Sequence, residues 1–320
     1  MKSFPLKIIV LYSDSEFTPW KENINAQTVI SLVQALSLQN EVTITHFNCM
    51  DECFAAFLKR FDLVYNVCYG FDSYSQADIV EWLDENEIPH TSSSWQAQLI
   101  AQDKGLLPSL CSEIGLQTPR LMEIDDILNH KGTMLLKPRF GSLHRGIHIF
   151  NEKNLPFKLL LDKDNLVQPY IDGKEFTVAV LPTEDGDGSI CLPPVEVVPF
   201  EQKEMFIAGN ASGKTYINYE PAIDTELRER MMNHVLRIHR RIGLKGMSRT
   251  DVRVKDNKVY ILDVNAMPNI DPKQSFLPNI GYYNGITYAE LVNRMVNCFH
   301  QHYNQQQTEK ALAQSFNFIN

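Results

Sequence analysis

Two short motifs in the C-terminal third of the chain carry the residues best suited to metal chemistry. Arg249 and Asp251 occupy alternate positions of one apolar run, and Asp263 and Asn265 occupy alternate positions of the next. Side chains two apart on a strand point to the same face, so a hairpin of these runs would gather all four. Two carboxylates and an amide oxygen suit a hard cation, and Mg²⁺ usually completes such a set with water and substrate phosphates.

A second interpretation of the same spacing stays open, in which both aspartates are solvated residues on the polar face of a half-exposed hairpin. The flanks favour the metal site, because residues 260–262 and Val264 are apolar and place Asp263 inside a buried strand. A charge in that position needs a partner or a metal.

A candidate phosphate-binding segment lies earlier in the chain. Lys137 ends the apolar run 134–136, and the loop after it carries Gly141, Ser142 and Gly146 before the next strand. Glycine and serine between strands allow backbone amides to approach phosphates. The same composition also fits a plain hairpin loop.

Residues 208–215 come within one glycine of a P-loop pattern, with Ala208 in the first glycine position. A P-loop needs a buried strand before it and a helix after it. Charged residues precede this segment, and a β-like run that Pro221 stops follows it. We therefore expect a flexible flap that carries Lys214.

Composition and charge exclude several other classes of protein. The chain has 320 residues, 44% of them hydrophobic, and a net charge of −9. It has no run of five basic residues, so a nucleic-acid-binding role is not expected. The apolar run at residues 8–12 is too short for a membrane span or a signal peptide, and the six scattered cysteines are expected to be reduced. These features predict a cytoplasmic protein.

The order of apolar runs predicts the elements that position these motifs. Strand and helix patterns alternate through the first ninety residues, which is typical of a parallel α/β sheet. Short β runs fill residues 133–190, and a long helix at 224–242 precedes the strands 248–254 and 258–264. A final helix is expected at 288–303, with a tail that frays after Asn304.

In this order the motifs resemble the D-alanine–D-alanine ligase family of the ATP-grasp superfamily. The resemblance runs from about Leu6 to about Tyr303 and is strongest at residues 62–70, 88–104, 136–149, 166–181 and 246–278. It implies an α/β (α+β composite) protein of the ATP-grasp fold. An N-terminal parallel α/β substrate domain (1–92) would precede two ATP-binding α+β domains, a central one (93–185) and a C-terminal one with the metal site (186–320).

The resemblance also implies roles for individual residues toward ATP. Two lysines would contact the phosphates under the small-residue loop, a glutamine and the hinge after it would bind adenine, and a glutamate would bind ribose. Lys214 would reach the γ-phosphate from the flap. These residues are Lys104, Lys137, Gly141, Ser142, Gln168, Tyr170, Ile171, Glu175 and Lys214.

On the metal and acceptor side, the resemblance assigns Asp251, Asp263 and Asn265 to two Mg²⁺ ions, with Mn²⁺ as an alternative metal. Arg249 would bind the acceptor carboxylate and steady the tetrahedral intermediate, with Ser275 beside it. Backbone amides would complete the oxyanion site.

The departures from the family pattern fall mostly on the substrate side. Glu16 is only a candidate for the glutamate that binds the donor's ammonium group, and Asn269 stands where the family has a glycine of the oxyanion hole. Phe276 replaces a leucine beside the acceptor, Gln168 replaces a glutamate, and Asp263 replaces a glutamate among the metal ligands.

We therefore predict an ATP-dependent carboxylate–amine ligase that works through an acylphosphate and uses an amino acid as acceptor. Its partners would be a small-molecule carboxylate and an amine, with no nucleic acid and no membrane, and a homodimer is a candidate assembly. An authentic D-alanine–D-alanine ligase, an ATP-grasp small-molecule kinase and a non-catalytic nucleotide-binding protein are the alternatives.

Overall fold

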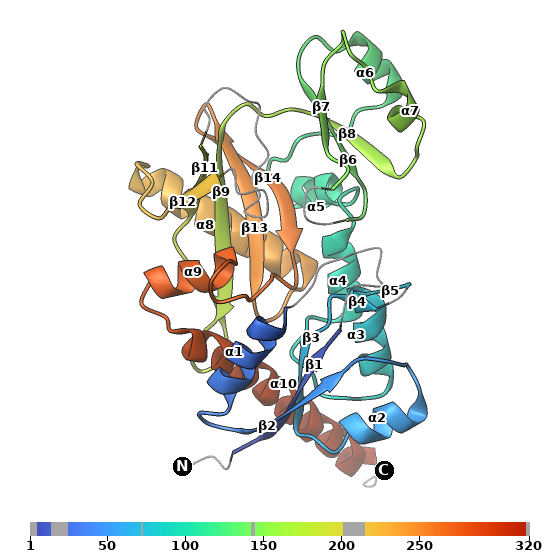
Figure 1. Ribbon diagram of the computed structural model, residues 1–320, viewed down its shortest axis with the longest axis vertical. Coiled ribbons are helices and arrows are strands. Elements are labelled where there is room, and N and C mark those ends of the chain that lie inside the picture. The colour runs from blue at the N-terminus through green and yellow to red at the C-terminus, as the bar shows by residue number, and fades with distance from the viewer. Residues whose placement is uncertain (1–4, 14–24, 72, 142–144, 201–214, 318–320) are drawn as a thin grey trace.

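The structure is a computed structural model that describes residues 5–13, 25–71, 73–141, 145–200 and 215–317. Within these residues the strands form a three-stranded sheet near the N-terminus, a small three-stranded sheet in the middle of the chain and a six-stranded sheet toward the C-terminus. The middle sheet forms a separate lobe at the top of Figure 1, and the N-terminal sheet lies at the bottom beside α10.

The N-terminal sheet is parallel, as the alternating pattern predicts, and its strand order is β2-β1-β3. Strands β1 and β3 are buried along almost their whole length, because helices cover both faces. The elements are β1 (Lys7–Tyr12), α1 (Ala26–Leu36), β2 (Glu41–His46), α2 (Glu52–Leu58), β3 (Leu63–Val67), the short pair β4 (Gly70–Phe71) and β5 (Tyr74–Ser75), and α3 (Gln76–Glu85).

The middle lobe is an antiparallel sheet of order β7-β6-β8 with two short helices. Its small core includes Met134 and Leu136, which alternate with outward-facing residues on the central strand. The elements are α6 (Ile124–Asn129), β6 (Met134–Pro138), β7 (His148–Phe150), α7 (Phe157–Leu160) and β8 (Asn165–Pro169).

The C-terminal sheet has the order β12-β11-β9-β13-β14, with β10 paired to β9. Strand β9 lies before the expected boundary at residue 186, yet it pairs with β11 and β13. The three-domain division therefore stays a prediction. Strand β9, which that division assigns to the central domain, belongs to the C-terminal sheet. The strands are β9 (Lys174–Pro182), β10 (Ser189–Cys191), β11 (Val195–Pro199), β12 (Thr215–Asn218), β13 (Ser248–Lys255) and β14 (Lys258–Asn265).

Helices cover both faces of this sheet. On one face, α4 (Trp95–Gln102), α5 (Leu107–Glu113) and α8 (Thr225–Ile242) share an apolar core with it. On the other, α9 (Phe276–Tyr283) and α10 (Tyr288–Asn317) share a core with it and with the N-terminal sheet. Helix α8 begins after the N-cap Asp224 and ends at the left-handed Gly243, as the sequence pattern predicts.

The expectation that the chain frays after Asn304 was wrong, because α10 continues to Asn317. Glutamine, glutamate, lysine and alanine are good helix formers, so the polar composition of this segment favours continuation. Lys310 also reaches across to Glu87 at 2.8 Å, which links the extension to the end of α3.

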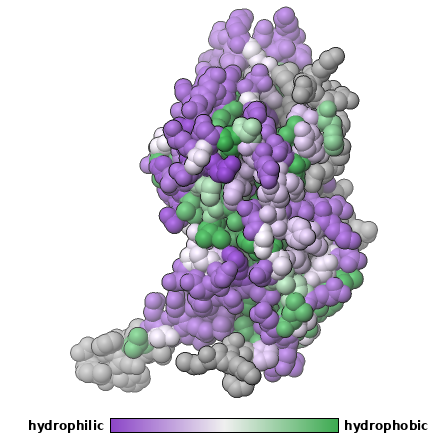
Figure 2. Space-filling view, turned by 90° about the vertical axis from the view of Figure 1, so that its left-hand side faces the viewer, coloured by the Kyte–Doolittle hydropathy of each residue, from purple (hydrophilic) through white to green (hydrophobic). Residues whose placement is uncertain are grey.

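The surface is largely hydrophilic on the face shown in Figure 2, with hydrophobic residues gathered near its mid-height. Within the described ranges, no helix combines the length and apolar character needed to span a bilayer.

Candidate active site

Strands β13 and β14 form the predicted hairpin. Arg249 pairs with Asn265 and Asp251 pairs with Asp263 across the two strands. The connecting turn is two residues long, and both Asp256 and Asn257 adopt positive φ angles of 49° and 59°. Such a turn matches the twist of antiparallel strands. The register shifts by one residue between Asp251 and Val252, and this shift places the two carboxylates opposite each other.

Asp251 is held by one group on its own strand and one on the neighbouring strand β9. The Arg249 guanidinium donates to both of its carboxylate oxygens, at 3.2 and 3.0 Å. The Thr177 hydroxyl of β9 donates to Oδ1 at 2.7 Å. The alternation predicted for Arg249 and Asp251 is therefore confirmed, and it produces an ion pair between them.

Asp263 faces a lysine from another part of the chain. Lys104, which follows α4, places Nζ 3.6 Å from Asp263 Oδ1 and donates to the Gly141 carbonyl at 2.7 Å. The Lys104 ammonium group thus connects the β13–β14 hairpin to the loop after β6. This is the arrangement expected if a phosphate chain binds between the hairpin and the loop.

The donor set fits a hard cation. Asn265 Nδ2 donates to the Arg249 carbonyl at 3.4 Å, which directs the amide oxygen away from the backbone. Nowhere in the described ranges do three His, Cys, Asp or Glu side chains gather at metal-binding distance. Asp251, Asp263 and Asn265 would therefore supply only part of a coordination shell, as is typical of Mg²⁺ sites that rely on water and phosphate oxygens.

Lys137 lies at the end of β6 with only 7% of its surface exposed. Its Nζ donates to the Leu262 carbonyl of β14 at 3.2 Å. Burial lowers the pKa of Lys137 to about 8, and the nearby Asp263 carboxylate opposes that shift. The lysine therefore joins the middle lobe to the hairpin and presents a donor close to the carboxylates.

A half-buried ion pair that the sequence did not reveal lies beside both lysines and contacts Lys104. Arg139 donates to the two carboxylate oxygens of Asp103 at 2.7 and 2.8 Å. Its carbonyl accepts from the Lys104 amide at 3.1 Å. The only signal in the sequence was position: Asp103 directly precedes Lys104, and Arg139 lies two residues after Lys137.

Six of the nine residues assigned to nucleotide binding line one cavity of about 630 Å³ between the middle lobe and the C-terminal sheet. Gln168, Tyr170, Ile171 and Glu175 share this cavity with Lys137. Gln168 Nε2 donates to the Pro119 carbonyl at 2.9 Å. A carbonyl can only accept, so this contact fixes which end of the amide faces the cavity.

Arg253 is a member of this cavity that the sequence analysis missed. Its guanidinium donates twice to Glu175 Oε2, at 2.9 and 2.7 Å, and once to the Ile171 carbonyl at 2.8 Å. Burial alone would lower the pKa of Arg253, yet the Glu175 carboxylate raises it above its ordinary value. The alternation of Arg249, Asp251 and Arg253 was a usable signal, because it continues along one strand.

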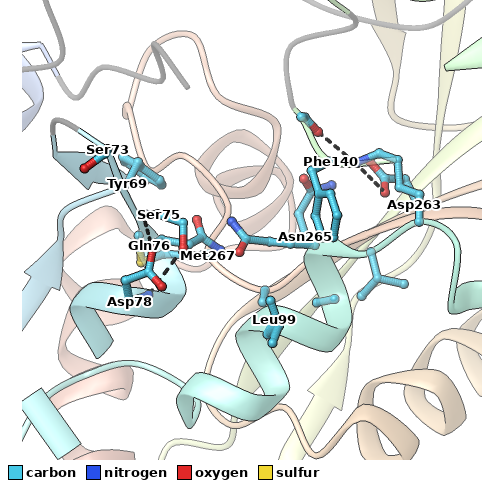
Figure 3. Close-up of a pocket in the computed structure, with 16 residues that line it drawn as sticks. Tyr69, Ser73, Ser75, Gln76, Asp78, Leu99, Phe140, Asp263, Asn265 and Met267 are labelled. Atoms are coloured by element: carbon cyan, nitrogen blue, oxygen red, sulfur yellow. Dashed lines mark hydrogen bonds and ion pairs between the residues drawn. The ribbon is translucent and has the colours of Figure 1, made fainter. Parts of the chain in front are cut away.

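A second cavity, of about 1030 Å³, adjoins the first at Lys104 and Asp263, which line both. In Figure 3, Tyr69, Ser73, Ser75 and Asp78 of the N-terminal lobe lie at one end and Asp263 and Phe140 at the other, with Asn265 between them. The N-terminal wall carries hydroxyl, amide and carboxylate groups, which suit a polar small molecule.

The acceptor-side residues meet at the start of α9. Phe276 lies under the Arg249 guanidinium, 5.4 Å from Cζ to the ring centre. The Ser275 hydroxyl donates to Asn269 Oδ1 at 2.8 Å, and the same oxygen accepts from the Asp271 amide at 2.8 Å. Asn269 is not among the non-glycine residues with a positive φ, so its backbone does not require glycine.

Three residues of the predicted site, Glu16, Ser142 and Lys214, lie outside the described residues. The structure brings the other members of the set together along the two adjoining cavities or around Arg249. Their roles toward bound molecules stay predictions.

Comparison with known proteins finds similarity to D-alanine–D-alanine ligases. Residues 153–297 match the family model described as the D-ala D-ala ligase C-terminus. A D-alanine–D-alanine ligase of Petrotoga mobilis is 25% identical over 284 residues, which cover 83% of this chain and 92% of that protein. The ligase of the same name from Fervidobacterium nodosum is 29% identical over 265 residues, which cover 75% of this chain and 82% of that protein.

Solved structures agree in fold. The D-alanine–D-alanine ligase of Bacillus anthracis complexed with ATP matches with a TM-score of 0.75 at 20% identity, over 94% of this chain and 99% of that one. The D-alanyl-alanine synthetase A of Vibrio cholerae gives a TM-score of 0.73 at 15% identity, over 93% of this chain and 99% of that one.

The chain is similar in sequence to D-alanine–D-alanine ligases over most of its length. The predicted ATP-grasp fold of mixed helices and sheets is confirmed. The sequence similarity indicates that the chain is an ATP-dependent ligase.

Proposed function

We propose that this ligase joins a carboxylic acid to the amino group of an amino acid through an acylphosphate. The observation that carries the proposal is that Lys104 and Asp263 line both cavities. A phosphate chain lying in the first cavity would end where the second one begins. The γ-phosphate of ATP would then face a carboxylate bound in the second cavity.

The first step transfers the terminal phosphoryl group. A carboxylate oxygen of the donor attacks the γ-phosphorus, the bond to the β,γ-bridging oxygen breaks, and ADP leaves. Charge spreads over the transferring phosphoryl oxygens. Lys104 and Lys137 are the cationic groups that support the proposal at this point, because both Nζ atoms lie on the cavity wall beside Asp263.

The second step forms the amide. The acceptor's amine attacks the acyl carbon, phosphate leaves with the electrons of the carbon–oxygen bond, and the amine loses a proton to solvent. Arg249 and the Asn269 amide are the proposed groups for the oxyanion and the acceptor carboxylate. Ser275 would exchange its contact with Asn269 for one with that carboxylate.

Asp251, Asp263 and Asn265 are the proposed ligands of two Mg²⁺ ions. When bound, these ions would neutralise phosphate charge and orient the terminal phosphoryl group. Arg249 and Lys104 lie 3.0 and 3.6 Å from the Asp251 and Asp263 carboxylates, respectively.

We further propose that at least one substrate is not D-alanine. The relatives that carry that name match at 25–29% identity, and the wall of the second cavity is formed by Tyr69, Ser73, Ser75, Gln76 and Asp78. An authentic D-alanine–D-alanine ligase is the second candidate, because it is the activity for which these relatives are named.

Phosphate release from MgATP, measured with D- and L-amino acids singly and in pairs, tests both proposals, with products identified by mass spectrometry. Phosphate and a new amide that appear only with a pair other than D-alanine support the ligase with altered substrates. D-alanyl-D-alanine from D-alanine alone supports the second candidate. A phosphorylated product without condensation would contradict both and support a kinase.

A further inference from the structure

Arg253 and Glu175 form an ion pair that is almost closed to solvent, with 4% and 7% of the two residues exposed. Both donated bonds end on one carboxylate oxygen, Oε2, at 2.9 and 2.7 Å. This geometry fixes the rotation of the carboxylate. A carboxylate paired with a guanidinium is a strong hydrogen-bond acceptor.

Stability alone is a poor explanation for this pair. Removing two charges from water is unfavourable by several kcal/mol per ion, and a pair of apolar residues of similar volume is often as stable. Both members also line the nucleotide cavity, beside Gln168 and Tyr170. A charged pair on a cavity wall is placed to act on what the cavity holds.

The remaining contacts of Arg253 link three segments of the wall. Its Nη1 donates to the Ile171 carbonyl, and its Cζ lies 4.6 Å from the centre of the Tyr170 ring. Ile171 and Tyr170 belong to the connection between β8 and β9, whereas Arg253 belongs to β13. One guanidinium therefore fixes the connection and the glutamate relative to each other.

We propose that Arg253 is a positioning residue that sets the preference of this ligase for ribose over deoxyribose nucleotides. It would do so by holding the Glu175 carboxylate at one orientation, in which that group accepts hydrogen bonds from the ribose hydroxyls. The inference rests on the proposed function, because it takes this cavity as the ATP site.

The test is the dissociation constants of ATP, 2′-deoxy-ATP and 3′-deoxy-ATP, measured by calorimetry with Mg²⁺ and no amino acid. The wild-type chain should bind ATP at least about tenfold more tightly than one of the deoxy forms, the loss expected for a hydrogen bond to a charged acceptor. Arg253→Met should reduce that ratio to about one. Arg253→Lys should give an intermediate ratio, because it keeps the charge without the fork of donors.

Two further variants keep the test decisive. The double variant Glu175→Gln with Arg253→Met removes both charges, so it should fold even if a single change does not, and it should also show a ratio of about one. Arg241→Gln is the matched control, because it breaks an exposed arginine–glutamate pair between α8 and α5 and should leave the ratio unchanged. Neither Arg241 nor its partner Glu113 lines either cavity.

Each outcome separates the two proposals. A wild-type chain that binds no ATP contradicts the proposed function and this inference together. A wild-type chain that binds ATP and prefers it to a deoxy form, with the same preference in Arg253→Met, overturns the inference alone. Equal binding of all three nucleotides by the wild-type chain also overturns the inference alone.

Discussion

Asp263 is a central side chain of the proposed site, because it lines both cavities and faces Lys104. We expect Asp263→Asn to lower the rate of phosphate release by about 100-fold, the loss typical of removing one electrostatic group from a transition state. Asp263→Glu should retain most of the activity, since it keeps the charge.

The measurement is the initial rate at saturating ATP across a range of Mg²⁺ concentrations. Asp187→Asn, an exposed change in the loop between β9 and β10, is the control. Full activity of Asp263→Asn at low Mg²⁺ would remove Asp263 from the metal site.

Gln168 is the single residue expected to distinguish the bases. The Pro119 carbonyl holds its amide nitrogen at 2.9 Å, so the amide oxygen is left to accept from the amino group of adenine. Gln168→Leu should raise the dissociation constant of ATP about three- to tenfold and narrow the preference for ATP over GTP. The exposed change Gln27→Leu on α1 should alter neither, and an unchanged preference in Gln168→Leu would contradict this role.

Residue types and strand alternation were sufficient to predict Arg249, Asp251, Asp263 and Asn265 as one group, because a short hairpin fixes which side chains share a face. Arg253 lay on the same alternation and was missed, since its partner Glu175 comes from a distant strand. Asp103 with Arg139 was missed for the same reason: 36 residues separate the pair, and no local pattern records the contact.

Among the elements, the β13–β14 hairpin depends most on its turn. Asp256 has a φ of 49°, a conformation that β-branched residues strongly disfavour. Asp256→Val should therefore lower the free energy of unfolding by about 1–2 kcal/mol, whereas Asp256→Gly should leave it nearly unchanged. Chemical denaturation measures both.

Lys255→Val is the matched control, because Lys255 is an exposed strand residue next to the turn. If it destabilises the protein as much as Asp256→Val does, turn strain is not the cause.

The sequence predicted the parallel N-terminal elements, helix α8 and the hairpin, where periodicity, caps and turn residues agree. It did not predict which sheet β9 joins, because a buried strand carries the same apolar run in either sheet. The predicted end of the last helix, at residue 303, was too early, because α10 continues to Asn317. The polar residues after Asn304 were interpreted as an unanchored tail, although they form helices well.

For the molecule as a whole, a buried histidine makes stability depend on pH. His239 of α8 lies 2.7 Å from the Ser248 hydroxyl, and burial together with Arg240 lowers the pKa of His239 from 6.5 to about 4. As pH falls, the unfolded chain takes up a proton on this histidine before the folded protein does. The stabilisation that comes from the neutral, buried His239 is therefore fully present above pH 6.5 and is lost as pH falls to about 4.

We expect the free energy of unfolding to fall by roughly 3 kcal/mol from this source across that window. His239→Gln should flatten the dependence, and His148→Gln, an exposed change on β7, should not. Denaturation at several pH values compares the three proteins. Parallel curves for wild type and His239→Gln would contradict the assignment.

The junction of the two cavities could not be derived from the sequence, because it arises only where three lobes meet. The order of the motifs was sufficient to indicate the similarity to D-alanine–D-alanine ligases and the ATP-grasp fold. The identity of the substrates depends on a wall contributed by the N-terminal lobe, whose residues carry no motif of their own.

The most direct test of the central claim uses a donor substrate with ¹⁸O in its carboxylate. An acylphosphate mechanism transfers one carboxylate oxygen to the departing phosphate, so the phosphate released during ligation should contain one ¹⁸O atom per molecule by mass spectrometry. Unlabelled phosphate, with all the label retained in the product or in the donor, would contradict the account.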